Sequence, residues 1–433
     1  MDNVRLRLAN KMLVIPKEKN SIWKTVRIEY MGKKTIVAIN SMTRGSTGKI
    51  MFEVAEGAKK AGYEYYTASA VHGNETRICN SDHIYISSKL EKKMHLILAK
   101  QFGMNGMFSH IGTFLFLRKL DLLNPDLIHL HNLHNCYINL PMLFSYIDKK
   151  KIPVVWTLHD CWSFTGHCPY FDMVSCDKWI NYCFECPQYK GYPYSRVDNT
   201  FKMFQRKKKW FSSENIKLLV TPSNWLASEV KKSFLQQHPI ETINNGIDLS
   251  IFKPYKSQIR EKLNIVDKKI VLGVANAWER RKGYDDFLKL QKMLGDDYQI
   301  ILIGMDNIPN EDGIIRIKRT ENQKQLAEFY SIADVFANPT YEEVFGMVNA
   351  EALACGTPVV TYKSGGSPES LCEGVGVIVE KGNISEFAKA IRKVCNEMKP
   401  VNACIDRAKK FSKELEIENY VSAYRGILKN EEK

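Results

Sequence analysis

Two glutamates flank a Phe-Gly turn in the segment NPTYEEVFGMVNAEALACGTPVV, near the carboxyl-terminal end of the chain. Residues 333–339 (ADVFANP) have the apolar run and Asn-Pro stop of a buried strand, and the composition of residues 347–354 favours a helix. Glu343 should therefore lie in the strand-to-helix loop and Glu351 inside the helix. The helix N-terminus behind Gly346 offers N–H groups to an anion, and carboxylates accept hydrogen bonds from hydroxyls. The pattern predicts a nucleotide-sugar site, although glutamates at this spacing also occur on solvated helix faces.

Other predicted strands also end in residues that can contact a ligand. The loop Gly45-Ser46-Thr47-Gly48-Lys49 follows the first strand and could cradle a phosphate, but it lacks the P-loop spacing and could be an ordinary turn. Residues 278–283 (WERRKG) place cations where they could neutralise a diphosphate leaving group, unless they form a plain surface cluster. His131 and His159 stand at two further strand ends, where His131 is a candidate for acceptor binding.

The cysteines are unevenly distributed, with five of the eleven inside residues 161–187. The four that could supply thiolates to one metal ion are Cys168, Cys176, Cys183 and Cys186. The closing Cys-x2-Cys has the spacing of a zinc knuckle. A structural zinc and reduced buried thiols are both compatible with this pattern, and redox chemistry is a third alternative. A catalytic zinc is not expected, because no open set of histidine or carboxylate ligands accompanies the cluster.

Strand-like and helix-like segments alternate along the chain, which predicts parallel α/β construction. The expected strands are residues 35–40, 127–130, 153–158, 217–221, 269–275, 299–303, 314–317, 334–337 and 358–361, and the expected helices include 50–61, 283–294, 323–332 and 384–398. Turn chemistry at residues 244–254 makes a plausible linker between two doubly wound domains. Ligands of such folds bind at the carboxyl ends of the strands, so the candidate residues should meet in one cleft.

These signals divide the chain into four parts. We expect an extension at residues 1–33, a first domain at 34–245 with a cysteine-rich insert at 161–187, a second domain at 246–408 and a last helix at 409–433. The extension lacks a convincing period, and Met31 begins a segment that resembles an ordinary protein start. Met31 is therefore a candidate for the true initiator.

Composition restricts the class of protein. A chain of 433 residues with 44% apolar residues can bury two full cores. The sequence contains no apolar run of transmembrane length and no signal-peptide core, so we expect a cytoplasmic protein. The net charge of +14 suits an anionic membrane surface or a phosphate-bearing acceptor, or it reflects scattered solubilising lysines. No nucleic-acid-binding module is found. Residues 206–211 (RKKKWF) are the best local candidate for a membrane-facing patch, and a solvated helix face is the alternative.

The segment EEVFGMVNAEALACGTPVV, followed by SGGSPES, resembles the donor-site signature of the retaining family-4 glycosyltransferases of GT-B fold. The segments WTLHDCWSFTGHCPYF, TPSNWLA and NNGIDLSIF resemble a narrower group, the bacterial transferases of colanic-acid, capsule and O-antigen clusters. The resemblance covers roughly residues 34–428. It implies two Rossmann-like domains that face each other across a cleft, with the acceptor on the first domain, the donor on the second, and the last helix crossing back to the first.

The resemblance also implies roles for single residues. It assigns catalysis to His159, Glu343, Lys282 and Arg281, and donor binding to Gly45, Gly48, Lys282, Glu343, Phe345, Gly346, Met347, Glu351, Gly365 and Gly366. His159 would contact the transferred sugar, Glu343 the sugar hydroxyls and Glu351 the ribose. Family members carry an arginine five residues before Lys282, where this chain has Ala277, and either Arg281 or Arg280 could supply the missing charge.

The function implied is transfer of a hexosyl unit, with retention, from a nucleotide-sugar to a growing surface polysaccharide. The acceptor would be an oligosaccharide carried on a polyprenyl diphosphate, with peripheral contact between the protein and the anionic inner face of the cell membrane. No catalytic metal is expected, and the chain has no Asp-x-Asp motif. The alternatives are a nucleotide-sugar epimerase of GT-B fold and a non-catalytic GT-B module that serves as scaffold or glycan binder.

Overall fold

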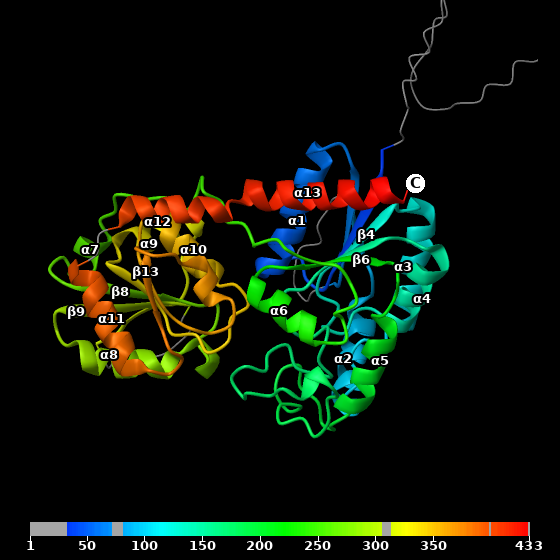
Figure 1. The fold of residues 1–433 in the computed structure, drawn as a ribbon, viewed down its shortest axis with the longest axis horizontal. Coiled ribbons are helices and arrows are strands. Elements are labelled where there is room, and N and C mark those ends of the chain that lie inside the picture. Colours follow the sequence, from blue (N-terminus) through cyan, green and yellow to red (C-terminus); the bar gives the residue numbers. More distant parts are fainter. Residues whose placement is uncertain (1–32, 72–80, 305–312, 398–399, 432–433) are drawn as a thin grey trace, which may run out of the picture. The chain divides into compact units, whose positions relative to one another are not determined.

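The computed structural model describes residues 33–71, 81–304, 313–397 and 400–431 (Figure 1). The predicted extension at residues 1–33 and the candidate initiator Met31 lie outside the described residues, apart from residue 33. Within the described ranges the chain builds two parallel sheets, each flanked by helices, so the predicted doubly wound α/β construction is confirmed.

The first sheet has the strand order β3-β2-β1-β4-β5-β6-β7 in the described part of the chain. Its strands are β1 (Thr35–Asn40), β2 (Glu64–Ser69), β3 (His83–Tyr85), β4 (Leu127–Leu130), β5 (Val154–Thr157), β6 (Ile216–Thr221) and β7 (Ile240–Thr242). The associated helices are α1 (Gly45–Lys60), α2 (Lys89–Phe102), α3 (His110–Leu123), α4 (Leu140–Lys150), α5 (Thr200–Trp210) and α6 (Asn224–Lys232). The order reverses between β1 and β4, which is the switch point of a doubly wound sheet.

The second sheet has the order β10-β9-β8-β11-β12-β13 among the described residues, with its switch point between β8 and β11. Its strands are β8 (Lys269–Val274), β9 (Tyr298–Ile303), β10 (Ile315–Ile317), β11 (Val335–Asn338), β12 (Val359–Tyr362) and β13 (Gly376–Val379). The helices are α7 (Ile259–Lys262), α8 (Tyr284–Leu294), α9 (Gln323–Ile332), α10 (Met347–Ala354), α11 (Ile384–Glu397) and α12 (Val401–Ala408).

Local sequence signals account for many of these elements. In α4, the Asn139 side chain accepts a hydrogen bond from the Met142 N–H, and Pro141 stands in the first turn, where it loses no helical hydrogen bond. The predicted strands at 35–40 and 127–130 and the predicted helix at 323–332 have the bounds of β1, β4 and α9.

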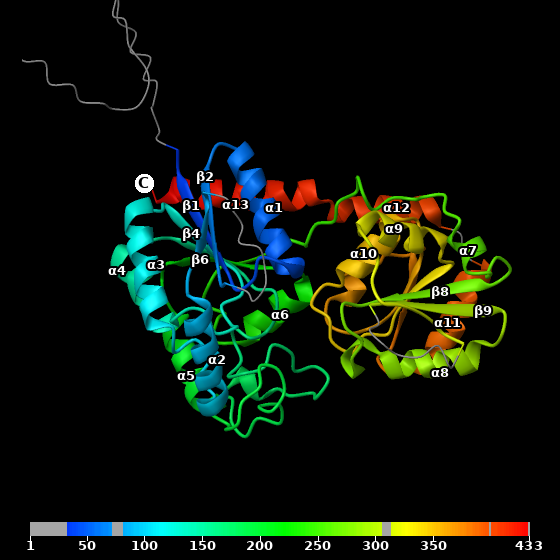
Figure 2. The ribbon, with the colours of Figure 1, turned by 180° about the vertical axis from the view of Figure 1, so that it is seen from behind.

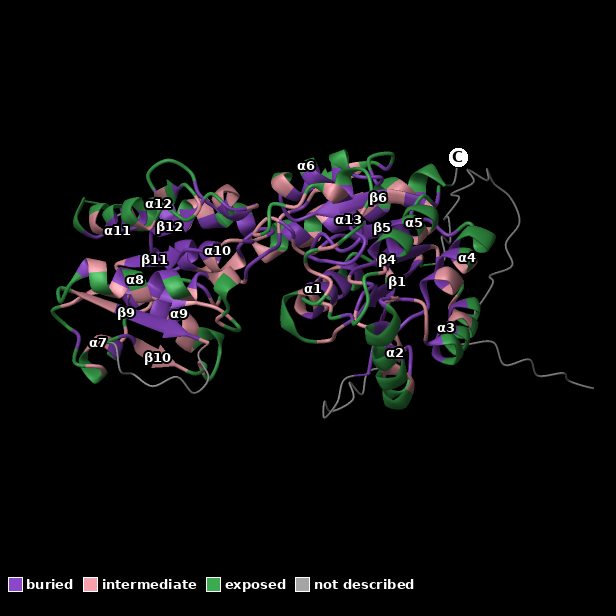
Figure 3. Ribbon diagram, turned by 90° about the horizontal axis from the view of Figure 1, so that it is seen from below, coloured by how far each residue is buried: buried purple, intermediate pink, exposed green. Residues whose placement is uncertain are grey.

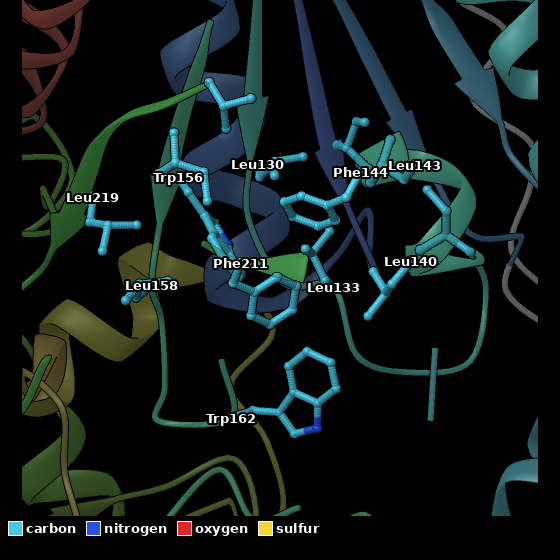
Figure 4. Packing of buried hydrophobic residues seen from close by; sticks show 14 of the residues in the cluster. Leu130, Leu133, Leu140, Leu143, Phe144, Trp156, Leu158, Trp162, Phe211 and Leu219 are labelled. Atoms are coloured by element: carbon cyan, nitrogen blue, oxygen red, sulfur yellow. The ribbon is translucent and has the colours of Figure 1, made fainter. Parts of the chain in front are cut away.

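Aromatic side chains fill the core beside the first sheet. Figure 4 shows Trp156 of β5 packed with Phe144 of α4 and Phe211, which follows α5. The rings of Trp156 and Phe211 lie 4.7 Å apart edge to face, and all three side chains are buried. This packing fixes β5, which carries site residues at its carboxyl end.

The last helix, α13 (Lys413–Asn430), crosses α1 at a steep angle and packs against it and the first sheet (Figures 1 and 2). Its Tyr420 and Tyr424 are fully buried. Tyr424 Oη lies 2.7 Å from His129 Nδ1, and Tyr420 Oη lies 2.9 Å from Thr157 Oγ1. A satisfied polar network thus attaches the chain terminus to β4 and β5.

The two segments that connect the sheets run side by side. Ile247 pairs with Ser412 in an isolated parallel bridge, with backbone hydrogen bonds to Phe411 and Lys413 on either side. Lys413 forms an ion pair of 2.6 Å with Asp248. The two domains are therefore joined by two chain segments, which are held together by hydrogen bonds and an ion pair.

Candidate functional site at the two switch points

Each sheet places some of the predicted site residues at its switch point. The loop after β1 leads into α1 through Gly45, and His131 follows β4 directly. In the second sheet, Lys282 precedes α8 after β8, and Glu343 follows β11. Since parallel neighbours end at the same edge, the fold brings residues that are far apart in sequence to two facing sets of loops.

The central pair of the second sheet is Lys282 and Glu343. Lys282 Nζ lies 2.6 Å from Glu343 Oε2, and the two side chains are about one fifth exposed. The Val344 N–H donates to Glu343 Oε1. Burial opposes ionisation, but the Lys282 ammonium, Arg281 and this N–H together lower the pKa of Glu343 below its ordinary value. The carboxylate is therefore ionised at neutral pH and forms a charge-assisted pair.

Arg281 is the second cation beside Glu343. Its guanidinium lies 4.6 Å from the centre of the Tyr170 ring and donates to the carbonyl oxygen of Glu342. Arg280 is exposed to solvent and lies near Tyr341 instead. Of the two arginines that could replace the missing charge at Ala277, the structure therefore favours Arg281.

The glycine turns bring backbone close to this pair. Gly346 has φ 81° and begins α10, and Gly365 has φ 53°. A Cβ at Gly365 would collide with the carbonyl oxygen of Glu343, and one at Gly366 would collide with that of Val344. These positions need glycine because the β12 loop packs directly on the loop that carries Glu343.

Asn349 on α10 joins these loops. Its side chain donates to Ser367 Oγ and Ser370 Oγ and accepts from Asn338 at the end of β11. The residue is fully buried. Sequence reasoning missed this positioning group, whose only signal is a polar side chain within an apolar helix.

Phe345 and Met347 differ in what they can offer a ligand. The Phe345 side chain is buried and its ring lies 5.3 Å from that of Phe411, so it belongs to the core. Met347 is half-buried at the first position of α10. Only the backbone of Phe345 is available for the donor contact predicted for it.

Glu351 does not share the hydrogen bonds of Glu343. It accepts a hydrogen bond of 3.0 Å from Tyr330 Oη on α9. Burial raises the pKa of Glu351 to about 7, while the Tyr330 hydroxyl and Lys49 oppose the rise. Glu351 therefore exchanges between its neutral and charged forms near neutral pH.

Two histidines meet at the ends of β4 and β5. His131 Nδ1 lies 3.0 Å from His159 Nε2, and the rings are stacked. Burial lowers the pKa of His159 to about 4 and holds the pKa of His131 well below its ordinary value. Both rings are neutral at physiological pH, so the pair can offer hydrogen bonds but no charge.

A histidine–aspartate pair lies at the same edge of the sheet, and neither residue was assigned a role from the sequence. His134 Nε2 lies 2.9 Å from Asp160 Oδ2, and Asp160 Oδ1 accepts the Trp162 N–H. The Tyr192 hydroxyl donates to Asn135 Oδ1 and lies 3.4 Å from His134 Nδ1. The buried Asp160 thus orients His134 toward the loops of the first sheet. The only sequence signal was position, next to His159 and three residues after His131.

The glycine loop after β1 is held by Asn40. Its side chain bonds the carbonyl oxygen of Met42, the Thr47 hydroxyl and the Ser41 N–H. Gly45 has φ 72° with open space around it, whereas a Cβ at Gly48 would collide with the Thr43 backbone. The turn is tight and begins α1 without a side-chain cap.

Two protein-family models match the chain. The model described as Glycosyltransferase Family 4 matches residues 50–251, and the model described as Glycosyl transferases group 1 matches residues 256–411. The chain belongs to the family-4 glycosyltransferases.

Known proteins agree with this assignment. The Escherichia coli K12 protein WcaC, whose name assigns it to colanic acid biosynthesis as a glycosyl transferase, is 23% identical over 61% of this chain and 66% of its own length. A D-inositol 3-phosphate glycosyltransferase of Geodermatophilus obscurus is 31% identical over 41% of this chain and 45% of its own. The glycosyltransferase spans about half to two thirds of the length of the curated relatives it matches.

Solved structures share the GT-B fold. Sucrose-phosphate synthase of Thermosynechococcus elongatus has a TM-score of 0.69 at 16% identity, with 92% of this chain and all of that chain covered. HepE of Anabaena, solved in complex with UDP-glucose, has a TM-score of 0.62 at 14% identity, covering 90% and 99%. The predicted two-domain GT-B architecture is confirmed.

The cysteine-rich insert of the glycosyltransferase contacts the second half. The Met173 N–H donates to Glu342 Oε1 at 2.7 Å, and Asp172 pairs with Lys381 at 2.9 Å. Glu369, after the Gly-Gly loop, accepts the N–H groups of Asn224 and Trp225 at the start of α6. Two segments of the first domain thus contact the loops that carry Glu342, Glu343 and the Gly365-Gly366 turn.

The described residues of the insert do not show the metal site that was one of the alternatives for its cysteines. Within the described residues, no three His, Cys, Asp or Glu side chains are arranged to hold a metal ion. Cys183 Sγ accepts the Gly166 N–H, and burial raises the pKa of Cys183 to about 12 and also raises that of Cys168. Structural zinc on Cys168, Cys176, Cys183 and Cys186 is therefore not supported by the arrangement of the described residues.

The basic run at residues 206–211, the candidate membrane-facing patch, is only partly exposed. Lys207 is fully buried, donates to the carbonyl oxygens of Trp162 and Thr165, and lies 3.3 Å from the centre of the Trp162 ring. Phe211 is equally buried. Two of the six side chains therefore point into the core. No helix among the described residues is long and apolar enough to span a bilayer.

Proposed function

We propose that this glycosyltransferase moves a hexosyl unit from a nucleoside-diphosphate sugar to a growing surface polysaccharide, with retention of configuration. The observation that carries the proposal is the Lys282–Glu343 pair, 2.6 Å apart at the switch point of the second sheet. A cation for the diphosphate and a carboxylate for sugar hydroxyls, held side by side, match the two ends of the bond that breaks.

On donor binding, the diphosphate takes the Lys282 ammonium away from Glu343 and leaves the carboxylate oxygens to accept from the sugar hydroxyls. Arg281 and the N–H groups at the start of α10 add to the stabilisation of the departing diphosphate. Glu351, with a pKa of about 7, can both donate to and accept from the ribose hydroxyls.

The reaction proceeds on one face of the sugar. The bond from the anomeric carbon to the diphosphate oxygen breaks, the acceptor oxygen bonds to the same carbon, and the departing oxygen takes the acceptor proton. The neutral His159 donates a hydrogen bond to the sugar from the first half, and His131 supports it through their 3.0 Å contact. No protein base is required.

The acceptor we propose is carried on a polyprenyl diphosphate, which places the reaction at the inner face of the cell membrane, with the protein as a peripheral component. A diphosphate-bearing lipid in an anionic membrane suits a chain of net charge +14. UDP-glucose, found with HepE, is the first donor to test.

Thermal-shift screening against UDP- and GDP-sugars tests donor binding, since a ligand selective for the folded state raises Tm. Transfer of radiolabel from the selected donor to polyprenyl-diphosphate-linked oligosaccharide then tests the reaction. We expect Glu343→Gln to lower transfer by about 100-fold, or about 2.7 kcal/mol. The control is Glu342→Gln, whose carboxylate contacts Met173 instead.

Three results would contradict the proposal. If none of the donors raises Tm, a scaffold or glycan-binding module is favoured. If the donor is converted to its epimer and no label reaches the acceptor, an epimerase is favoured. Transfer by Glu343→Gln at the rate of the parent would show that the Lys282–Glu343 pair does not take part in the reaction.

A further inference from the structure

Helices α2 and α3 expose large apolar side chains to solvent. On α2, Leu90 is 70% exposed and Ile97 51%, and on α3 Ile111 is 72% exposed and Leu122 87%. The full set, called the α2–α3 face below, consists of Leu90, Met94, Leu96, Ile97, Phe102, Ile111, Phe114, Leu115 and Leu122. Figure 3 shows exposed turns along both helices. Single exposed apolar residues are ordinary, but such a set on neighbouring helices marks an interaction site.

The two helices form one rigid surface. Both carboxylate oxygens of Glu91 on α2 accept the Gly112 N–H in the first turn of α3, at 3.0 Å each. His95 Nδ1 lies 2.8 Å from Ser109 Oγ, and His95 Nε2 accepts the Gly106 N–H. The loop between the helices is therefore anchored to α2 by two side chains one turn apart, and the exposed residues keep their relative positions.

The charges around the face are positive. Exposed basic residues stand among its apolar members, namely Lys89, Lys93, Lys100, Arg118 and Lys119. In the part of the chain that the structure describes, none of these five forms an ion pair with a carboxylate. The neighbouring acids are already occupied, since Glu91 caps α3 and Asp121 pairs with Lys150 at 2.7 Å. Apolar side chains bordered by unpaired cations are typical of helices that lie in an anionic membrane interface.

An aromatic segment continues the face toward the catalytic loops. The Arg196 N–H donates to the carbonyl oxygen of Lys100, and Lys100 Nζ lies 6.0 Å from the centre of the exposed Tyr194 ring. Two residues earlier, the Tyr192 hydroxyl donates to Asn135 beside His134. Tyrosines favour the membrane–water interface, so the segment gives a route from that interface to the edge of the first sheet.

We propose that the α2–α3 face docks on an anionic lipid bilayer, with its apolar side chains among the acyl chain ends and its lysines at the headgroups. This inference rests on the proposed lipid-linked acceptor, which the docked enzyme would meet at the interface. A second copy of the chain is a poor occupant, because pairing two such faces would bring the five basic residues of each copy together.

Sedimentation of the full chain with vesicles of phosphatidylcholine, with or without 30% phosphatidylglycerol, tests the proposal. We expect binding to the anionic vesicles that weakens with salt. Leu90→Gln/Ile111→Gln should reduce partitioning at least tenfold, and Lys93→Glu/Lys119→Glu should reduce it in anionic vesicles. The matched control is Val266→Gln/Ile378→Gln, which removes two exposed apolar side chains from the second half.

A second readout separates this inference from the proposed function. Donor-dependent transfer to a detergent-solubilised acceptor should be the same in all variants, because none of the substituted residues lies in the site. Equal vesicle binding by all four proteins would overturn the docking surface and leave the transferase function intact. A stable dimer in analytical ultracentrifugation that Leu90→Gln/Ile111→Gln dissociates, without vesicle binding, would assign the face to a second copy and also overturn it.

Discussion

Glu416 on α13 is a buried carboxyl group whose ionisation should weaken the fold at alkaline pH. The side chain is 1% exposed, and among the described residues no donor makes a hydrogen bond of normal geometry to either oxygen. Burial raises the pKa of Glu416 from 4.5 to about 8, with Glu53 adding to the rise and the nearby Gly246 N–H and Lys49 opposing it. The group lies where the paired connections meet the last helix.

The sign follows from proton binding. Between pH 4.5 and 8 the folded chain holds the Glu416 proton and the unfolded chain does not, so stability falls as pH rises through this window. Each pH unit costs about 1.4 kcal/mol, and the interval from pH 6 to 8 therefore costs about 2.5 kcal/mol. With an unfolding entropy of about 2 cal/mol/K per residue, a chain of 433 residues converts this into about 3 °C in Tm.

Glu416→Gln removes the titration and keeps the shape of the side chain. Between pH 6 and pH 9, the Tm of the parent should fall by about 3 °C more than the Tm of Glu416→Gln. The measurement is calorimetry in buffers of equal ionic strength. The control is Glu418→Gln, an exposed position of the same helix, whose difference should stay constant. A Glu416→Gln difference that does not change with pH would refute the reasoning, whatever its absolute size.

Three further predictions concern the site. Arg281→Ala should weaken nucleoside-diphosphate binding at least tenfold in titration calorimetry, and Arg280→Ala should not, since only Arg281 borders Glu343. Asp160→Asn should lower kcat/KM for the acceptor about tenfold and change the donor-induced Tm shift little, because Asp160 bonds to His134 and Trp162 rather than to the loops proposed to bind the nucleoside diphosphate. Gly366→Ala should cost several kcal/mol of stability because its Cβ meets backbone and a neighbouring side chain, whereas Gly426→Ala, in open space on α13, should stabilise by up to about 1 kcal/mol.

The sequence was sufficient to predict the helices and strands whose ends carry candidate site residues. Strand periodicity and turn residues are local signals, so β1, β4, α9 and α10 were predicted with their bounds. In a doubly wound sheet such bounds also place the loops, which is why Lys282 and Glu343 could be expected at one edge. Strands β2, β3, β7 and β13 were missed, and of these β3 and β7 have only three residues each, too few to show a period.

Pairwise contacts between distant loops were beyond the sequence. Lys282 and Glu343 lie 61 residues apart, and nothing in either segment says that they neutralise each other without a donor. Arg280 and Arg281 are adjacent in the short turn before α8, and their side chains point in different directions. Which of them lies beside Glu343 follows from the contact between Arg281 and Tyr170, which is distant in sequence.

The basic residues of α5 show that helical periodicity decides which side chains are buried in charged segments as well as in apolar ones. In α5 the buried positions are Thr200, Met203, Phe204 and Lys207, spaced by three and four residues, so the helix period itself takes Lys207 inward. Reading RKKKWF as a charge run ignored that period. In α2 the same test gives the opposite result, because Leu90, Met94 and Ile97 follow a helical spacing but remain exposed. A helical apolar stripe on the surface of a basic domain therefore points to an external partner, and the lysines between its members specify an anionic one.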